Sequence, residues 1–273
     1  MKKPGKSPWA ILPLALAILL CLLPGCSGQE EEPLSLDNLE GKKIGAMIGY
    51  SSDYILTKYD YGVELYRYSL YSDMQLALKF KKIDAAAMEM DEAKVFVRNE
   101  PGFKIAMNFK EGIDYGYYFN AEKNELREQF NTFIKEFRKT DTYSDLVKRA
   151  GDIETKPFVA KHVENTPTTD KVVKVCVLGG WEPVSYLNTA NDQWEGVDIE
   201  LITHFANSLG ARIEFKELSW EQMLIELGQG IVDLSTCPDS FLLKTDLEMS
   251  GKIRMSEAVW LKDIVFIVNK EGK

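Results

Sequence analysis

The sequence predicts an α/β protein that is built from two successive α/β units. Short apolar runs alternate with amphipathic helical segments between residues 42 and 151, and the alternation begins again at residue 171. This order is typical of strands that lie mostly parallel in a sheet whose two faces are covered by helices. Residues 152–170 lose the periodicity and gain Pro and Thr, so we expect a connector there. The 273 residues are ample for one or two large cores, and we find no short repeat.

In the first unit, apolar runs predict strands at residues 42–49, 62–68, 83–89, 104–109 and 114–121. Helical spacing predicts helices at residues 51–59, 72–82, 91–102, 124–138 and 142–151. Ser51 favours a helix start, and Gly151 favours a helix end. The residues expected on the buried sides of two of these helices are Met74, Leu76, Ala77 and Leu78, and Leu126, Phe130, Phe133, Ile134 and Phe137.

The second unit repeats this alternation. Its strands are predicted at residues 171–179, 212–218, 232–237 and 263–270, and its helices at residues 197–210 and 219–230. Ser219 and Gln222 have the spacing of a capping box, which predicts that a helix begins there. Gly210 favours the end of the preceding helix.

The first 25 residues have the pattern of a signal peptide. Three lysines precede an apolar run at residues 9–23, which is short for a membrane-spanning helix. The run ends in "LLPGC", which resembles the bacterial lipobox and implies cleavage before Cys26 and attachment of lipid to it. A plain secretory leader with an incidental Cys is the alternative. Residues 26–40 are polar and acidic and are expected to form a tether, so we expect a periplasmic or surface-exposed lipoprotein of the cell envelope, anchored to a membrane through Cys26.

Charge and cysteine content exclude several classes of function. The formal net charge is −9, and removal of residues 1–25 would remove three lysines and no acid. An acidic body argues against nucleic-acid binding, which needs positive charge to replace counterions. Cys176 and Cys237 lie in apolar, strand-like segments, and buried free thiols are favoured over a disulfide. No Cys or His spacing indicates a metal site, and no cofactor is expected.

An ordered set of motifs resembles the amino-acid-type bacterial extracellular solute-binding proteins (family 3), which have the type 2 periplasmic binding protein fold. The segment "GWEPVSY…WEGVDIELITHF…SWEQMLIELGQGIVDLS" is similar to the family's opening half. The earlier "DNLEGKKIGAMIGYSSDYIL", "YSDMQLALKFKKIDAAAME" and "DYGYYFNAEKNELREQFNTF" are similar to its closing half. The positions that carry the first similarity are Trp181, Pro183, Gly196, Asp198, Trp220, Gly230 and Asp233.

The resemblance implies two Rossmann-like lobes with mixed, mostly parallel sheets joined at a hinge, in circularly permuted order. Residues 41–114 correspond to the family's C-terminal lobe, which we call lobe 2. Residues 115–273 correspond to lobe 1: a returning strand and helices at 115–151, the connector at 152–170, and the family's N-terminal half at 171–273. We expect one crossing between the lobes near residues 114–119, and both chain ends near the hinge.

The resemblance also implies a ligand cleft between the lobes, beyond the carboxyl ends of their strands. Trp181 and Trp220 match aromatic positions of the family and could sandwich an apolar or planar part of a ligand; buried wall residues are the alternative. The turn that faces them from lobe 2 could offer backbone N–H groups to an anion, or could be an ordinary helix cap. Its residues are Gly49, Tyr50, Ser51 and Ser52.

Acidic and hydroxyl groups complete the site that the resemblance implies. Glu89 occupies the position of an acid that faces the ligand's amine; a solvated surface charge is the alternative. Asp239 and Ser240 lie in a loop where the family supplies backbone and hydroxyl groups to the ligand. The family's early Asp is Leu178 here, and its carboxylate-binding Arg is not found. Lys244 could replace that Arg, as could Arg254, although Lys offers a point charge rather than a fork.

These features predict a lipid-anchored protein that captures a small polar, amino-acid-like solute for an ABC transporter permease, without catalysis. A dehydratase-like enzyme on the same scaffold is one alternative. Its acid and base groups would have to converge on the cleft, but neither His162 nor His204 lies at a strand end, and nothing in the sequence requires Glu89 and Asp239 to pair. A ligand sensor that signals to a separate partner is the other alternative.

Overall fold

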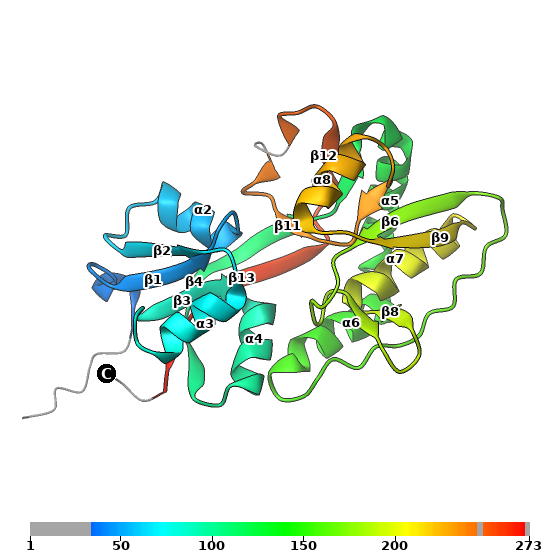
Figure 1. Ribbon diagram of the computed structural model, residues 1–273. Coiled ribbons are helices and arrows are strands. Elements are labelled where there is room, and N and C mark those ends of the chain that lie inside the picture. The colour runs from blue at the N-terminus through cyan, green and yellow to red at the C-terminus, as the bar shows by residue number, and fades with distance from the viewer. Residues whose placement is uncertain (1–33, 245–247, 271–273) are drawn as a thin grey trace, which may run out of the picture. The chain divides into compact units, whose positions relative to one another are not determined.

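The computed structural model describes residues 34–244 and 248–270 (Figure 1). The predicted leader and residues 26–33 of the predicted tether (26–40), including Cys26, lie outside the described residues. For residues 34–40 the tether prediction was wrong, because Leu36–Asn38 form a 3-10 turn and Leu39 is buried in the core. The strands are β1 Lys43–Met47, β2 Glu64–Tyr68, β3 Ala85–Glu89, β4 Phe103–Gly116, β5 Tyr118–Asn120, β6 Val172–Val177, β7 Tyr186–Asn188, β8 Gln193–Glu195, β9 Arg212–Glu217, β10 Leu234–Ser235, β11 Asp239–Ser240, β12 Ile253–Met255 and β13 Trp260–Asn269. The helices are α2 Ser51–Lys58, α3 Tyr71–Lys79, α4 Met90–Asn99, α5 Asn124–Phe137, α6 Asp141–Gly151, α7 Val197–Ser208 and α8 Trp220–Gly228, with 3-10 turns η2 Leu36–Asn38, η3 Ala121–Lys123 and η4 Asp152–Glu154.

Two mixed sheets organise these elements, which confirms the predicted α/β class. The sheet of lobe 2 has the order β11-β4-β13-β3-β1-β2, and the sheet of lobe 1 has the order β12-β5-β10-β6-β9. In lobe 2, β1 pairs in parallel with β2 and β3, whereas β13 is antiparallel to β3 and β4. In lobe 1, β6 pairs in parallel with β9 and β10, and β5 is antiparallel. A short hairpin of β7 and β8 lies outside both sheets.

Both faces of the lobe 2 sheet are buried beneath helices. Helix α2 covers one face, and α3 and α4 cover the other (Figure 1). Residues 85–88 alternate between these faces, because successive side chains of a strand point in opposite directions. In α3 the buried residues are Met74, Ala77 and Leu78, whereas Leu76 is 50% exposed. The prediction that Leu76 is buried was wrong, because it lies off the stripe that residues i, i+3 and i+4 form.

The lobe 1 sheet is packed in the same manner. Val175 and Phe119 face the cluster that includes α5 and α7, while Cys176 and Tyr118 face α8. The predicted inner stripe of α5 is confirmed: Phe130, Ile134 and Phe137 are buried, and Leu126 and Phe133 pack against the same cluster. Cys176 and Cys237 are both buried and free, as predicted. The capping box of Ser219 and Gln222 is present at the start of α8.

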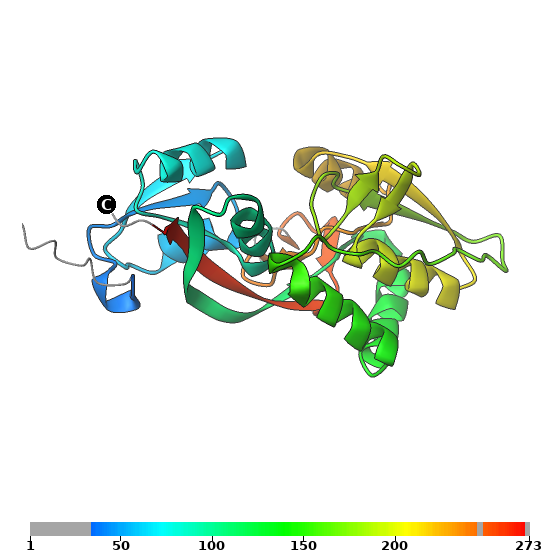
Figure 2. The same ribbon diagram turned by 90° about the horizontal axis from the view of Figure 1, so that it is seen from below.

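Strand β13 corrects the predicted boundary of lobe 1. The prediction assigned residues 171–273 to lobe 1, but β13 pairs with β3 and β4 and therefore lies in the lobe 2 sheet. The chain enters it from β12 of lobe 1 through residues 256–259, and it makes the reverse crossing between β4 and β5 at Tyr117. Strands β4 and β13 run beside each other from the far end of lobe 2 towards lobe 1 (Figure 2).

The same strand corrects the predicted position of the chain ends. Asn269 pairs with Phe103, whereas Trp260 pairs with Tyr115 beside the crossing. Lys43, the first residue of β1, lies at the same far end as Asn269, since Ile44 pairs with Ala85 and β1 runs parallel to β3. Residues 43 and 269 therefore lie away from the hinge, because β13 continues unbroken along the whole sheet. The predicted strands at 104–109 and 114–121 are likewise the long β4 followed by the short β5.

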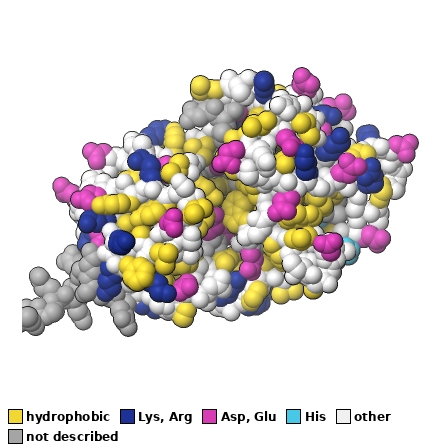
Figure 3. All heavy atoms as spheres, in the orientation of Figure 1, with side chains coloured by type: hydrophobic (Ala, Val, Ile, Leu, Met, Phe, Trp, Pro, Cys, Tyr) yellow, Lys and Arg dark blue, Asp and Glu magenta, His cyan; other side chains and the backbone are white. Residues whose placement is uncertain are grey.

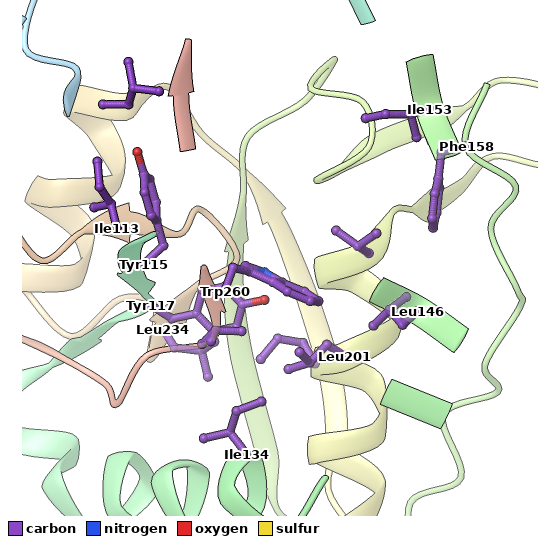
Figure 4. Packing of buried hydrophobic residues seen from close by; sticks show 14 of the residues in the cluster. Ile113, Tyr115, Tyr117, Ile134, Leu146, Ile153, Phe158, Leu201, Leu234 and Trp260 are labelled. Carbon is purple, nitrogen blue, oxygen red and sulfur yellow. The ribbon is translucent and has the colours of Figure 1, made fainter. Parts of the chain in front are cut away.

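A buried carboxyl group connects the two crossing segments. Asp198, in the first turn of α7, accepts a hydrogen bond from Trp260 Nε1 at 2.6 Å and another from the Tyr117 hydroxyl. Tyr117 and Trp260 lie close together within the packed core (Figure 4). Asp198 is fully buried and its Oδ2 has no hydrogen-bond partner among the described residues. Burial raises the pKa of Asp198 to about 7, although the hydrogen bond from Tyr117 opposes the shift.

The packing beneath this carboxyl group depends on a glycine. Gly196 has a φ of 137°, and a Cβ atom there would come within 2.2 Å of the Val184 carbonyl oxygen. The amides of Val197 and Asp198 bond to the carbonyl groups of Pro183 and Val184, so the backbone passes close to this loop. Only glycine permits both the conformation and the approach.

Among residues 34–244 and 248–270, none of the helices has the length and apolar character needed to cross a bilayer.

Replacing Asp198 tests this connection. Asp198→Ala leaves two buried donors without an acceptor and is expected to lower the free energy of unfolding by about 2–5 kcal/mol. Asp198→Asn retains an acceptor and should cost less. Because the folded-state pKa of Asp198 is about 7, above the ordinary 3.8, this group's contribution to stability falls as the pH rises between those values. Urea unfolding at pH 5 and pH 8 should therefore show Asp198→Asn gaining stability relative to the natural protein at the higher pH. An equal difference at both pH values, as expected for the exposed control Asp170→Asn, would contradict this account.

Candidate ligand-binding site

A cavity of about 440 Å³ lies where the carboxyl ends of the parallel strands of both lobes meet. Lobe 2 contributes the segments after β1, β2 and β3, and lobe 1 contributes the segments after β6 and β10 and the start of α8. We call it the interlobe cavity. The surface is hollowed between the two lobes, with hydrophobic side chains in the hollow and Asp and Glu side chains beside it (Figure 3). This is the position at which α/β sheets bind ligands.

The side chains that line the interlobe cavity fall into three groups. The aromatic ones are Tyr50, Tyr71, Tyr115, Trp181 and Trp220. The carboxyl-bearing ones are Glu89, Glu92, Glu221 and Asp239. The small or apolar ones are Met47, Ile48, Gly49, Ser51, Ser69, Leu178, Gly179, Gly180, Cys237 and Pro238.

A pair of carboxyl groups lies at the end of β3. Glu89 is the N-cap residue of α4, and Glu92 follows in the first turn of that helix. Burial raises the pKa of Glu89, and a hydrogen bond with Glu92 opposes this shift. Burial, followed by the charge of Glu89, raises the pKa of Glu92 well above its ordinary value. A negative charge on either carboxyl group disfavours ionisation of the other.

Tyrosine hydroxyl groups surround this pair. The Tyr115 hydroxyl lies 3.2 Å from Glu89 Oε1 and 3.0 Å from Ser51 Oγ, and the Tyr71 hydroxyl donates to Glu92 Oε2. Glu89 is only 4% exposed, and no hydrogen-bond donor among the described residues reaches its Oε2. The pair therefore keeps one buried acceptor unused at the cavity wall.

Lys262 stabilises two of the aromatic walls without lining the cavity. Its Nζ lies 2.6 Å from Asp91 Oδ2, and 5.2 Å and 5.4 Å from the ring centroids of Tyr115 and Trp181. Burial alone would lower the pKa of Lys262, but the adjacent Asp91 raises it above its ordinary value. Lys262 is therefore a fixed ammonium group that is already paired with a carboxylate.

The lobe 1 wall is held by its backbone. Trp181 and Ser185 exchange two backbone hydrogen bonds of 2.9 Å, and the Trp181 Nε1 atom is buried without a partner among the described residues. Trp220 begins α8 directly after the Ser219 cap. Asp239 accepts from the Tyr118 hydroxyl at 2.8 Å, and burial raises its pKa to about 6. These groups add two indoles from lobe 1 to the cavity wall, and Asp239 adds a carboxyl group from β11, which pairs with β4 in the lobe 2 sheet.

The turn after β1 has fewer free N–H groups than the sequence suggested. Gly49, with a φ of 79°, donates its N–H to Asp53 Oδ2 at 3.1 Å, and the Tyr50 N–H bonds to the Met47 carbonyl at 3.2 Å. Asp53 thus places the chain's own carboxylate at the start of α2. Ser52 does not line the cavity, and its Oγ is buried without a partner among the described residues.

The structure brings together most of the predicted site residues. Gly49, Tyr50, Ser51, Glu89, Trp181, Trp220 and Asp239 line the interlobe cavity. Ser240 does not, because its N–H bonds to Asp239 Oδ1 and its Oγ accepts from the Leu242 N–H. Lys244 lies over the Phe241 ring at 5.1 Å and is also absent from the wall. Arg254 bonds to the Glu248 and Ile253 carbonyl groups instead of entering the cavity.

Sequence reasoning missed several wall residues. Glu92 was recoverable, since it follows Glu89 by three residues at the predicted strand-to-helix junction and must share its helix face. Tyr71 and Tyr115 gave no local signal, because their place at the wall depends on pairing between distant strands. His204 packs against Phe137, with ring centroids 5.2 Å apart, and lies outside the cavity. The described residues contain no cluster of three or more His, Cys, Asp or Glu side chains that could hold a metal ion.

The unused acceptor at Glu89 has a measurable cost. Because burial raises the pKa of Glu89 in the folded state, its contribution to stability falls as the pH rises above the ordinary value of 4.5. Glu89→Gln removes the charge, so its free energy of unfolding should exceed that of the natural protein at pH 8 by about 1 kcal/mol or more. The difference should shrink towards pH 5. Urea titrations at both pH values check this, with the exposed Glu154→Gln as control; a loss of stability in Glu89→Gln at pH 8 would refute it.

Comparison with known proteins relates one segment of the chain to a family. Residues 173–270 match the family model of the bacterial extracellular solute-binding proteins, family 3. Over 92 residues the chain is 35% identical to the L-cystine-binding protein TcyA of Bacillus subtilis (strain 168). That stretch covers 32% of this chain and 33% of TcyA, so the match spans about a third of that relative's length.

Solved structures give broader coverage at lower identity. A ligand-binding component of an ABC-type import system from Staphylococcus aureus, with zinc bound, aligns with a TM-score of 0.44 and 12% identity, covering 84% of this chain and 66% of that chain. The probable amino-acid ABC transporter extracellular-binding protein ytmK from Bacillus subtilis aligns with a TM-score of 0.43 and 9% identity, covering 85% of each chain. The resemblance stated from the sequence is confirmed for residues 173–270, which are similar to family 3 of the bacterial extracellular solute-binding proteins.

Proposed function

We propose that this protein is an extracytoplasmic solute-binding protein that captures a small amino-acid-like solute and delivers it to an ABC-type uptake transporter. The observation that carries the proposal is the interlobe cavity, which both lobes line at the carboxyl ends of their strands. The match of residues 173–270 to family 3 supports it. The names of L-cystine-binding TcyA and of ytmK, an amino-acid transporter component, favour a solute of the amino-acid class.

The connection between the lobes supports capture by closure. The lobes are joined by short crossing segments, and a ligand that contacts both walls stabilises the closed arrangement over the open one. Beside the cavity, Arg98 of α4 forms a two-pronged ion pair with Glu182 of lobe 1, at 3.1 Å and 2.8 Å. Arg98 also donates to the Ile153 and Lys156 carbonyl groups. These contacts are suited to form and break as a cleft closes and opens.

We further propose that the chain follows the family's two halves in circularly permuted order and is anchored through a lipid on Cys26. The segment that matches family 3 follows β1 to β5 in the chain, and it supplies much of lobe 1 together with β11 and β13 of the lobe 2 sheet. The "LLPGC" sequence supports the lipid anchor. A lipid tether would hold the protein near a membrane-embedded permease, which would raise the local concentration of captured solute.

An enzyme on the same scaffold is the second candidate. The Glu89–Glu92 pair favours it, because two carboxyl groups with raised pKa values are suited to general acid and base catalysis. Incubation of the protein with each solute that it binds, followed by mass spectrometry of the recovered solute, separates the candidates. Unchanged solute supports the binding protein, and a dehydrated product supports the enzyme.

A thermal-shift screen of amino acids, amines, small peptides and organic acids tests solute binding. A solute present at 100 times its Kd should stabilise the protein by about 2.7 kcal/mol. Trp220→Ala should weaken binding at least about tenfold, since a desolvated aromatic contact typically contributes more than 1 kcal/mol. Phe80→Ala is the control, because Phe80 is 67% exposed and lies outside the cavity. If no solute class raises the melting temperature, the binding function is refuted.

A further inference from the structure

The charges on the walls of the interlobe cavity all have one sign. The carboxyl-bearing side chains there are Glu89, Glu92, Glu221 and Asp239, and no Lys or Arg lines the cavity among the described residues. The cations near its walls are already paired, Lys262 with Asp91 and Arg67 with Asp53. A ligand that enters therefore meets negative potential without a compensating positive group.

The unused acceptor indicates what kind of group the cavity takes. Glu89 Oε2 is buried, has no donor among the described residues, and belongs to a side chain that lines the cavity. A buried acceptor without a donor is unfavourable, and a ligand N–H placed there would relieve the cost. A protonated amine supplies both the N–H and the opposite charge, whereas a quaternary ammonium supplies only the charge.

The aromatic walls suit the rest of such a ligand. Tyr50 and Tyr71 meet edge to face, with ring centroids 5.9 Å apart. Tyr115 and Trp181 already hold the Lys262 ammonium at 5.2 Å and 5.4 Å from their ring centroids, so these rings lie where cations are stable. Trp220 adds a further face for an apolar chain or ring.

A ligand carboxylate finds no Lys or Arg among the described residues that line the cavity. At the turn after β1, the Gly49 and Tyr50 N–H groups are occupied, and the Asp53 carboxylate already lies at the start of α2. Lys244 and Arg254 do not reach the cavity wall. A carboxylate would lie among like charges in a partly buried space, which costs several kcal/mol when unpaired.

We propose that the interlobe cavity binds a protonated organic amine that carries no carboxylate, with its N–H groups on Glu89 and its apolar part against Trp181 and Trp220. This inference rests on the proposed function. It narrows the class of solute from amino-acid-like compounds to amines that lack the carboxylate of an amino acid. The ligand is an alkyl or aryl amine of the size of a decarboxylated amino acid.

Calorimetric titration with matched probes tests the proposal. Phenylalanine is compared with 2-phenylethylamine, 3-phenylpropanoate and trimethyl(2-phenylethyl)ammonium, and lysine with 1,5-diaminopentane. Within a set, the amine should bind at least about tenfold more tightly than the amino acid and than the quaternary ion, and the carboxylate should not bind. An amino acid that binds as tightly as its amine overturns the amine proposal but leaves solute binding intact. Failure of every probe overturns the amine proposal, and failure of the whole solute screen also overturns the proposed function.

Removal of one charge locates the amine. Glu89→Gln should weaken amine binding by about tenfold to a hundredfold, because it replaces a charge-assisted hydrogen bond by a neutral one. Glu154→Gln, which alters an exposed acid outside the cavity, should bind normally. If Glu89→Gln does not fold, Glu92→Gln serves the same purpose, with circular dichroism melting as the check. Full amine affinity in a folded variant of either residue would overturn the proposal.

Amine binding should also depend on pH. The groups that face Glu89 and Glu92 are Tyr50 after β1, Tyr71 of α3, Asp91 of α4, Tyr115 of β4, Asp239 of β11 and Lys262 of β13. Burial raises the pKa of Asp239 to about 6 and raises the pKa values of the pair, so these carboxyls lose charge as the pH falls. The amine remains protonated, so its affinity should rise about tenfold or more from pH 5 to pH 7. Affinity that is flat or falls over this range contradicts the proposal.

Discussion

The arrangement of the two lobes depends on the buried carboxyl group of Asp198. It accepts hydrogen bonds from the Trp260 indole N–H and the Tyr117 hydroxyl, which lie on two of the segments that carry the chain between the sheets. The backbone conformation of Gly196 and its close approach to Val184 determine where α7 begins, and this places the Asp198 carboxyl group in the core. Helix N-termini favour a carboxylate, but here burial dominates and the pKa rises to about 7. The Asp198 side chain of lobe 1 therefore fixes the positions of these two segments relative to each other.

The proposed ligand site differs from this core, because some of its buried polar groups have no hydrogen-bond partner among the described residues. Glu89 Oε2 and Trp181 Nε1 are buried without partners among the described residues, and burial raises the pKa values of Glu89, Glu92 and Asp239. Such groups reduce the stability of the empty protein. They also provide a gain in free energy that becomes available only when a complementary ligand arrives.

Local pattern predicted much of this architecture. The alternation of apolar runs and amphipathic segments gave the α/β class, and the helical spacing of Phe130, Ile134 and Phe137 gave the inner face of α5. The spacing of Ser219 and Gln222 predicted the capping box at the start of α8. The resemblance to solute-binding proteins predicted that Glu89, Trp181 and Asp239 belong to one site, and all three line the interlobe cavity. Each of these features depends on residues that are close in sequence or on an ordered set of motifs.

What the sequence did not predict depends on contacts between distant segments. Strand β13 joins the sheet of lobe 2 although it follows segments of lobe 1 in the chain. It lies between β3 and β4 and pairs with both. Tyr115 reaches the cavity only through that pairing. The short strands β11 and β12 lie in a stretch without periodicity. Lys244 was expected at the ligand on the basis of its charge, but it lies over Phe241, since the loop after β11 folds back on itself.

A distance measured between the lobes tests the central claim most directly. Spin labels at Phe80→Cys, directly after α3, and at Ile225→Cys on α8 use exposed positions in different lobes, and Cys176 and Cys237 are buried and shielded from labelling. Pulsed electron paramagnetic resonance would give the distribution of distances between the two spin labels, without ligand and with a saturating amine. The account predicts that the amine shortens and narrows the distribution. An unchanged distribution in the presence of bound amine would contradict the clamp.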